Sequence, residues 1–179
     1  MRTIGMFHYS EQKQPKQIDK HYTPTGLAAR LVSLVPVGQR EFVLDPAAGT
    51  NLAFYNHFPR NRMKCEIADG SDFLTKPLEY DWAITNPPYH LLWKFIDKAS
   101  HEARKGFAFL VNIHGINTLT PKRLALLRKR GLHMRRLHVI NVKEWMGRYY
   151  FYVFSKKSGN VVYTWDEQIW SHSGGQARK

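Results

Sequence analysis

The clearest chemical signal in the sequence is the string Asn86-Pro87-Pro88-Tyr89. An exocyclic amine on an aromatic ring is a weak nucleophile, because its lone pair is delocalised into the ring. If the side-chain oxygen of Asn86 and the carbonyl of Pro87 both accept hydrogen bonds from that amine, the lone pair is freed for attack. The prolines fix the direction of the carbonyl, and Tyr89 offers a flat face on which the target ring can stack. The string predicts group transfer to a planar NH2 group, driven by positioning rather than by a strong base.

A second segment with chemical potential is Asp45-Pro46-Ala47-Ala48-Gly49-Thr50-Asn51, which lies between an apolar run and a helical pattern. Gly49 lets the backbone turn tightly and approach a ligand. The N–H groups at the start of the expected helix favour an anion, such as the carboxylate of a methionine moiety. Asp-Pro followed by small residues is also an ordinary strand-to-helix connection, so the segment alone does not specify a ligand.

Two further acidic positions follow the next apolar run. Glu66 lies at its end, where carboxylates of nucleotide-binding sites accept hydrogen bonds from ribose hydroxyls. Asp72 and Phe73 place a carboxylate beside an aromatic ring, so Asp72 could hold an adenine amino group while Phe73 packs on the ring. An exposed solubilising carboxylate, or a turn Asp before two core residues, would look the same in the sequence.

Short apolar runs alternate with helical patterns, and this predicts an α/β fold with a mostly parallel sheet covered on both faces by helices. Strands are expected at 42–44, 65–67, 82–85, 107–111, 137–142, 149–154 and 161–165, and helices at 25–35, 52–58, 90–104 and 121–130. The connection between 142 and 149 is too short for a crossover helix, so the sheet should have an antiparallel C-terminal edge strand. Ligands of such sheets bind at the carboxyl ends of the strands, where all three chemical segments lie.

The charge of the chain indicates a polyanionic partner. The formal net charge is +13, and no Asp or Glu occurs from Ala103 to Lys143. This acid-free segment could face phosphate groups, with Arg128, Lys129 and Arg130 as its densest cluster, or its cations could simply solvate helix faces. We do not expect a membrane protein, because the sequence has no apolar stretch of about 18 residues. We do not expect a secreted protein either, because its first residues lack the apolar region of a secretory signal. The single cysteine, Cys65, is expected to be buried, to form no metal site and to fit a reducing cytoplasmic compartment.

From Lys20 to Leu110 the sequence resembles the class I S-adenosylmethionine-dependent amino-methyltransferases with a (D/N/S)PPY motif, and in particular the compact DNA adenine-N6 methyltransferases of phages. His21-Tyr22-Thr23-Pro24-Thr25 is similar to motif X, Asp45 to Gly49 to motif I, and Asn86 to Tyr89 to the catalytic motif IV. The resemblance implies a Rossmann-like fold and S-adenosylmethionine as cofactor. The residues it implies at the cofactor are Tyr22, Thr23, Pro24, Asp45, Pro46, Ala47, Gly49, Asn51, Glu66, Asp72, Phe73 and Asn86.

The chain departs from this family in three respects. Asn51 stands where motif I often has a second glycine, the segment from Glu66 to Asp72 is too short for a crossover helix, and no insertion is large enough for a separate target-recognition domain. We therefore expect one methyltransferase domain over residues 1–179, with sequence specificity that is low or supplied by a partner subunit. Trp145 and Tyr149 are candidates to press on a flipped base, though core aromatics would look no different.

Four functions remain open on the sequence alone. The leading one is methylation of an exocyclic amine of a nucleic acid, with N6 of adenine in DNA as the target. RNA is a second substrate, because net charge does not separate it from DNA. Methylation of a protein glutamine amide uses the same motif, and a basic nucleic-acid-binding protein without activity belongs to another class altogether.

Overall fold

The structure of the protein is a computed structural model that describes residues 22–173, so His21 of the expected motif X lies outside the described residues. Seven strands form one sheet in the order β2-β1-β3-β4-β6-β5-β7. Their bounds are β1 Val43–Asp45, β2 Arg62–Lys64, β3 Trp82–Thr85, β4 Gly106–Asn112, β5 His133–Val142, β6 Arg148–Ser155 and β7 Val162–Trp170. The predicted α/β fold with a mostly parallel sheet is confirmed.

The antiparallel strand lies inside the sheet and not at its edge. β6 runs antiparallel to both of its neighbours, β4 and β5, whereas every other strand pair is parallel. The short turn after β5 reverses the chain, as the sequence predicts, and β6 then fills the gap between β5 and β4. A second reversal brings β7 back along the outer side of β5, where it forms the edge.

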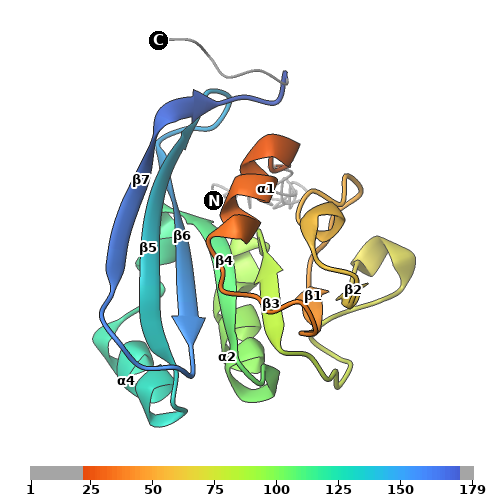
Figure 1. Cartoon of the computed structure of the whole chain (residues 1–179), viewed down its shortest axis with the longest axis vertical. Helices are drawn as coiled ribbons and strands as arrows, with labels where there is room; N and C mark the ends of the chain where they lie inside the picture. Colours follow the sequence, from red (N-terminus) through yellow and green to blue (C-terminus); the bar gives the residue numbers. More distant parts are fainter. Residues whose placement is uncertain (1–21, 174–179) are drawn as a thin grey trace, which may run out of the picture.

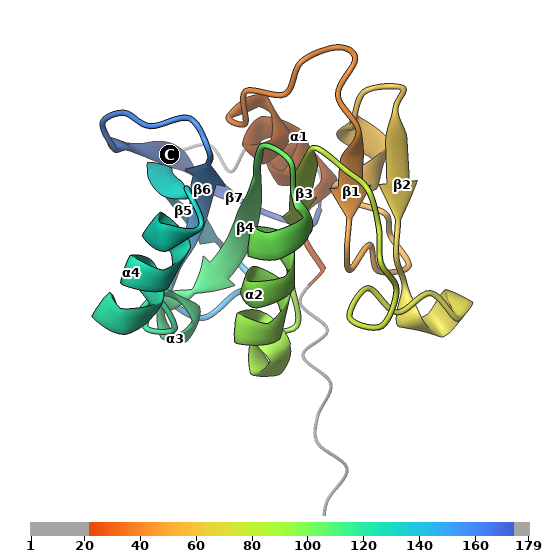
Figure 2. The ribbon, with the colours of Figure 1, turned by 90° about the horizontal axis from the view of Figure 1, so that it is seen from below.

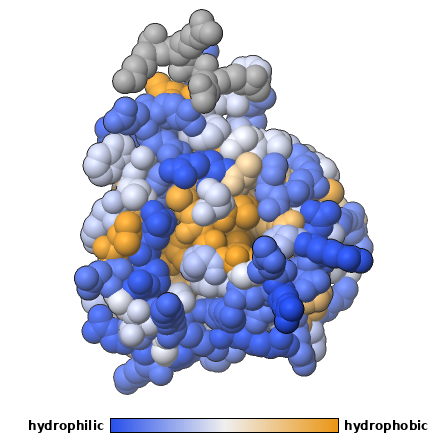
Figure 3. All heavy atoms as spheres, viewed as in Figure 1, coloured by the Kyte–Doolittle hydropathy of each residue, from blue (hydrophilic) through white to orange (hydrophobic). Residues whose placement is uncertain are grey.

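Helices cover both faces of the sheet, as Figures 1 and 2 show: α1 (Thr25–Ser33) lies on one face, and α2 (Leu92–Glu102), α3 (Ile113–Ile116) and α4 (Pro121–Lys129) lie on the other. Two clusters of buried apolar side chains follow from this arrangement. Leu27 and Leu31, four residues apart, face the sheet from α1, and Phe95 and Ala99 do so from α2. On the face that α1 covers, apolar residues gather in the middle and hydrophilic ones surround them (Figure 3).

The predicted helix at Leu52–Phe58 is wrong. The segment contains only a 3-10 turn, η1 (Tyr55–His57), and Leu52 has a left-handed φ of 51°. Asn56 and His57 are weak helix formers and Pro59 follows, so burial of Ala53, Phe54 and Phe58 in the core decides the conformation instead.

The second strand is displaced from its predicted position. It spans Arg62–Lys64 rather than 65–67, and Ile67 begins the 3-10 turn η2 (Ile67–Asp69). An edge strand that is three residues long and rich in charged residues has no apolar pattern, so it could not be predicted from the sequence. No crossover α-helix separates β2 from β3, which agrees with the expectation from the short segment after Glu66.

Candidate functional site

A cavity of about 590 Å³ opens at the carboxyl ends of β1 and β3. Its walls come from the segments that follow these strands and β2, and from the two residues before Pro24 at the start of α1. All of the predicted site residues line it except Pro24 and Asp45, which are buried beside it. The lining residues among them are Tyr22, Thr23, Pro46, Ala47, Gly49, Asn51, Glu66, Asp72, Phe73, Asn86, Pro87, Pro88 and Tyr89.

Hydrogen bonds orient the amide of Asn86. Its Nδ2 donates to Oγ1 of Thr23 at 3.3 Å, and its Oδ1 accepts from the hydroxyl of Tyr89 at 3.1 Å. Thr23 is buried, and its carbonyl also accepts a hydrogen bond from Nδ2 of Asn51 at 3.3 Å. Thr23 therefore links the predicted motif IV to the segment after β1. The oxygen of Asn86 has two lone pairs, so it can accept from a target amine in addition to Tyr89.

Glu66 holds the turn after β1 in place. Its Oε2 accepts a hydrogen bond from the backbone amide of Gly49 at 2.8 Å, and its Oε1 accepts from the amide of Ala68 at 3.2 Å. Gly49 has a φ of 62°, which favours glycine, and the ring of Tyr22 lies over it. The amide of Gly49 is thus already bonded, and no α-helix follows it, so the expected anion site at a helix start is not formed.

The aromatic ring of Phe73 belongs mainly to the core. It is 1% exposed and packs against Phe95, with ring centroids 5.1 Å apart. Ile67 lines the same cavity and is 68% exposed, so it offers the apolar surface on which a planar ligand could rest. Sequence reasoning missed Ile67 because it counted the residue as part of a buried strand. Asp72 lines the cavity and accepts a hydrogen bond from the amide of Leu74 through Oδ1 at 2.8 Å.

Asp45 supports the site from below the cavity. Its carboxylate is buried, and Oδ1 accepts a hydrogen bond from the amide of Ala47 at 3.3 Å. Burial raises the pKa of Asp45 to about 7, against the lowering effect of that hydrogen bond. Asp45 therefore acts on the turn of residues 46–49 rather than on a ligand in the cavity.

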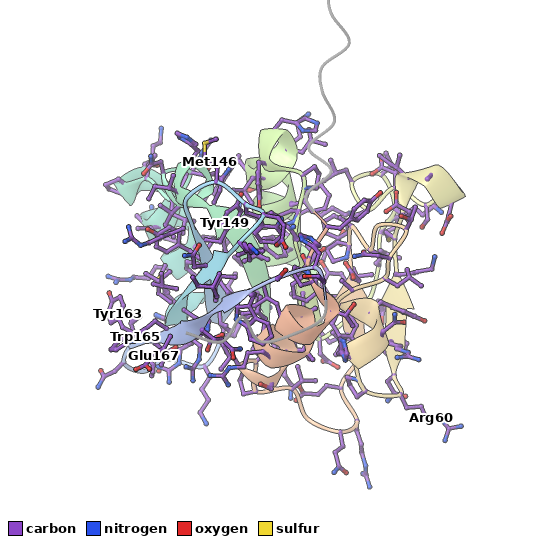
Figure 4. All side chains as sticks on the ribbon, turned by 90° about the horizontal axis from the view of Figure 1, so that it is seen from above. Arg60, Met146, Tyr149, Tyr163, Trp165 and Glu167 are labelled. Atoms are coloured by element: carbon purple, nitrogen blue, oxygen red, sulfur yellow. The ribbon has the colours of Figure 1, made fainter. Side chains whose placement is uncertain are left out.

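Trp145 and Tyr149 do not line the cavity. Both are buried in the core cluster under α1, with ring centroids 4.5 Å apart, because the tight turn between β5 and β6 directs them inward. Figure 4 shows Tyr149 within the body of the molecule and Met146 at its periphery. The structure therefore gives these two aromatic rings a packing role, and they are not placed to press on a base.

The acid-free segment does not form one surface. α4 ends at Lys129 and leads into β5, whose first residue lies at the amino edge of the sheet, opposite the cavity (Figure 1). Arg130 is also engaged, since its guanidinium bonds to Asp97 at 2.8 Å and to the hydroxyl of Ser100. The predicted cluster of Arg128, Lys129 and Arg130 therefore lies far from the cavity.

Other basic side chains lie nearer the cavity. Lys143 and Arg148 flank the turn between β5 and β6, which lies at the same edge of the sheet as the cavity, and both are exposed. His90 lines the cavity itself and is exposed. The cations Lys143 and Arg148 are the ones that could meet phosphates next to a substrate bound there.

No protein-family model matches the sequence, and the search of curated proteins finds no match. Solved structures do share the fold. A Listeria monocytogenes protein described as a class I S-adenosylmethionine-dependent methyltransferase is 12% identical, with a TM-score of 0.51 over 82% of this chain and 62% of that chain. The methyltransferase subunit of a type I restriction-modification system from Streptococcus thermophilus is 14% identical, with a TM-score of 0.56 over 80% and 46%. Precorrin-6y C5,15-methyltransferase from Geobacter metallireducens is 12% identical, with a TM-score of 0.54 over 78% and 91%.

The chain therefore has the Rossmann-like fold of the class I methyltransferases, and it spans less than two thirds of the Listeria and Streptococcus proteins. The cofactor expected from the sequence, S-adenosylmethionine, is the one that this class of methyltransferases uses. Within residues 22–173, no helix is long and apolar enough to cross a membrane. Nor do these residues include a group of three or more His, Cys, Asp or Glu side chains that could hold a metal ion.

Proposed function

We propose that the protein transfers a methyl group from S-adenosylmethionine to an exocyclic amine of a nucleic acid, with N6 of adenine in DNA as the target. The observation that carries the proposal is the oriented amide of Asn86, which lines the large cavity of a class I methyltransferase fold. A protein that only bound nucleic acid, without catalytic activity, would have no need of this hydrogen-bonded arrangement.

The residues of the cavity fit the cofactor. Glu66 and Asp72 supply carboxylate oxygens for hydroxyl and amino groups, and Ile67 supplies an exposed apolar surface for a purine ring. Tyr22 and Gly49 close the opposite wall. The cofactor, when bound, supplies an electrophilic methyl group on a sulfonium centre.

The protein's own contribution to the reaction is positioning and polarisation. Oδ1 of Asn86 and the carbonyl of Pro87 accept hydrogen bonds from the target amine, which frees its lone pair. Tyr89, between the two core clusters and at the cavity wall, offers its ring for stacking. Thr23 accepts a hydrogen bond from the nitrogen of the Asn86 amide, which favours the orientation in which the oxygen acts toward the amine.

Nucleic acid as the substrate is supported by the net charge of +13 and by the exposed cations Lys143 and Arg148 at the cavity's edge of the sheet. The fold shared with the type I restriction-modification subunit points in the same direction. We further propose that residues 1–179 act as one methyltransferase domain.

The test is incubation with isotopically labelled S-adenosylmethionine and, separately, DNA, RNA and a protein extract, followed by analysis of the labelled product. Labelled N6-methyladenine from DNA is the expected result, and Asn86→Ala should reduce its formation by on the order of a hundredfold or more. Asn56→Ala, at an exposed residue outside the cavity, is the matched control. Label found only in RNA, or only in protein glutamine, would replace the DNA proposal with that substrate.

Binding of the cofactor is measured separately. S-adenosylmethionine should raise the melting temperature through mass action, and Asp72→Ala should weaken that rise while Asn86→Ala changes it far less. No shift at saturating cofactor would contradict the methyltransferase proposal as a whole.

A further inference from the structure

The edge strand β7 carries two exposed aromatic side chains far from the cavity. Tyr163 and Trp165 are each 67% exposed and lie two residues apart, so both project from the same face of the strand. Figure 4 shows them pointing outward at one side of the molecule, with Arg60 at the opposite side. Large exposed aromatics that gather in this way on a soluble protein indicate a binding surface.

The opposite face of β7 is firmly attached. Oδ2 of Asp166 accepts a hydrogen bond from Nε1 of Trp170 at 3.0 Å, and Oδ1 pairs with Nε of Arg30 on α1 at 3.3 Å. Oγ1 of Thr164 lies 2.9 Å from Nδ1 of the buried His138 on β5. Tyr163 and Trp165 therefore project from a rigid strand, and a partner that binds them need not order a flexible loop.

Basic side chains surround the amino end of this strand. The turn from β6 to β7 lies at the edge of the sheet where α4 ends and β5 begins, because β5 and β7 are parallel and in register there. Arg135 packs against this turn at Gly159. The cations at this corner are the exposed Arg128, Lys129, Lys156 and Lys157, together with Arg135, which is only partly exposed and whose Nη1 atom is buried.

Acidic groups are scarce around the corner. From Arg128 to Trp165 the only acidic residue is Glu144, which lies at the opposite edge of the sheet in the turn between β5 and β6. Glu167 follows Trp165 on the exposed face of β7, and Asp166 is engaged with α1. A second carboxylate, that of the partly exposed Asp97, is paired with Arg130 next to Lys129. The cations still outnumber these carboxylates, so the charge of the corner complements a polyanion.

We propose that this corner, formed by Tyr163, Trp165 and the five cations, binds single-stranded DNA outside the catalytic cavity. Unpaired bases stack on aromatic rings regardless of sequence, and the cations contact the phosphates between them. Same-face residues of a strand are spaced by about 7 Å, which is about twice the spacing of stacked bases and matches one base held between two side chains. A duplex buries its base faces, so it cannot use the aromatic pair.

The inference rests on the proposed function only in taking DNA as the polymer, since it concerns a different surface and a different measurement. It also gives a role to Arg128 and Lys129, which cannot reach the cavity. A strand held at this corner would tether the protein to DNA while other DNA enters the cavity.

The test is binding of fluorescent oligodeoxythymidylate by the full chain, with a duplex of equal length and oligouridylate as comparisons. The double variant Tyr163→Ala/Trp165→Ala should weaken single-strand binding at least tenfold, with the salt dependence of binding kept. Lys156→Ala/Lys157→Ala should instead flatten the slope of log affinity against log salt. Trp165→Phe should retain binding, because it keeps a stacking face, and Arg60→Ala, which removes an exposed cation on the far side of the molecule, is the control for position.

Several outcomes would overturn the proposal. These are unchanged oligodeoxythymidylate binding by the aromatic double variant, equal loss of duplex binding, or a clear preference for oligouridylate. Loss of a dimer in the double variant, with DNA binding intact, would assign the surface to a second copy of the chain. If DNA is bound at this corner but never methylated, the inference stands and the proposed function fails. If DNA is methylated but the aromatic double variant binds oligodeoxythymidylate normally, the proposed function stands and the inference fails.

Discussion

At the scale of single residues, the site depends on which way one amide faces. Asn86 could present either its oxygen or its nitrogen to a ligand, and only the oxygen can polarise an amine. The hydroxyl of Thr23 settles this by accepting from Nδ2, and the hydroxyl of Tyr89 donates to Oδ1. The orientation of the Asn86 amide therefore involves a residue that lies more than sixty positions earlier in the chain.

Replacement of that hydroxyl gives the first prediction. Thr23→Val removes the acceptor for Asn86 while keeping the shape of the side chain, so the amide loses its fixed orientation. We expect kcat to fall about tenfold with little change in the melting shift caused by the cofactor. Thr118→Val, at a partly exposed residue outside the cavity, is the control and should retain most of its activity. A normal kcat in Thr23→Val would contradict the orienting role.

The second prediction concerns the buried carboxyl of Asp45. Burial raises its pKa to about 7 from 3.8, so the folded state holds a proton that the unfolded state releases. Its contribution to the free energy of unfolding is complete below about pH 4 and is lost as the pH rises through about 7. Asp45→Asn lacks this dependence, and its stability relative to the wild type should improve between pH 5 and pH 8 in urea unfolding. A constant difference across that range would show that Asp45 does not titrate as described.

At the scale of elements, α1 is joined to the outer strands through one carboxylate. Asp166 on β7 pairs with Arg30 of α1, accepts from Trp170 and lies 3.3 Å from Nε2 of the buried His138. α1 follows directly on Tyr22 and Thr23, so this contact also supports one wall of the cavity. The segment beyond β7 reaches the same wall, where His172 bonds to the carbonyl of Tyr22.

The third prediction is that Asp166→Ala lowers the free energy of unfolding by about 1 to 3 kcal/mol, because it leaves Nε1 of the half-buried Trp170 without its acceptor and removes the ion-pair partner of Arg30. Glu79→Ala removes a fully solvated ion pair with Arg104 and should cost less than about 1 kcal/mol. Urea unfolding of both variants compares the two costs. Equal effects would mean that the contacts of Asp166 contribute no more to the free energy of unfolding than an ion pair on the surface.

Elements with strong periodicity could be predicted from the sequence, and elements shaped by their surroundings could not. The strand before Asn86 and the helices at Thr25 and Pro121 have clear apolar patterns, and they occur where expected. The segment Leu52–Phe58 carries helix-like spacing, yet core burial of its apolar residues overrides it. Ile67 could be recognised as a cavity residue only after the turn that exposes it was known.

At the scale of the whole molecule, the sequence identified an excess of positive charge but not its distribution. Topology separates cations that are close in the chain: Arg128 and Lys129 lie at the amino edge of the sheet, and Lys143 lies at the carboxyl edge with the cavity. No pattern in the sequence distinguishes these two groups, because the direction of β5 decides where each one lies.

The fourth prediction follows from this division. Lys143→Ala/Arg148→Ala should reduce kcat/KM for duplex DNA and flatten its dependence on salt, because these cations lie at the edge of the cavity. Arg128→Ala/Lys129→Ala should leave kcat/KM for a short duplex nearly unchanged. Methylation rates for both pairs at two salt concentrations provide the comparison. The opposite ranking would show that the substrate approaches from the amino edge of the sheet.

The position of β6 in the sheet has a consequence for the synthesis of the chain. β4 and β5 are both made before β6, yet neither pairs with the other, because β6 lies between them. A nascent chain that ends before Arg148 therefore leaves both edges of β5 and one edge of β4 unpaired, and β4 contains the apolar stretch Phe107–Val111. The central sheet can close only when Arg148–Ser155 has left the ribosome, and until then the ribosome-bound chain is open to aggregation.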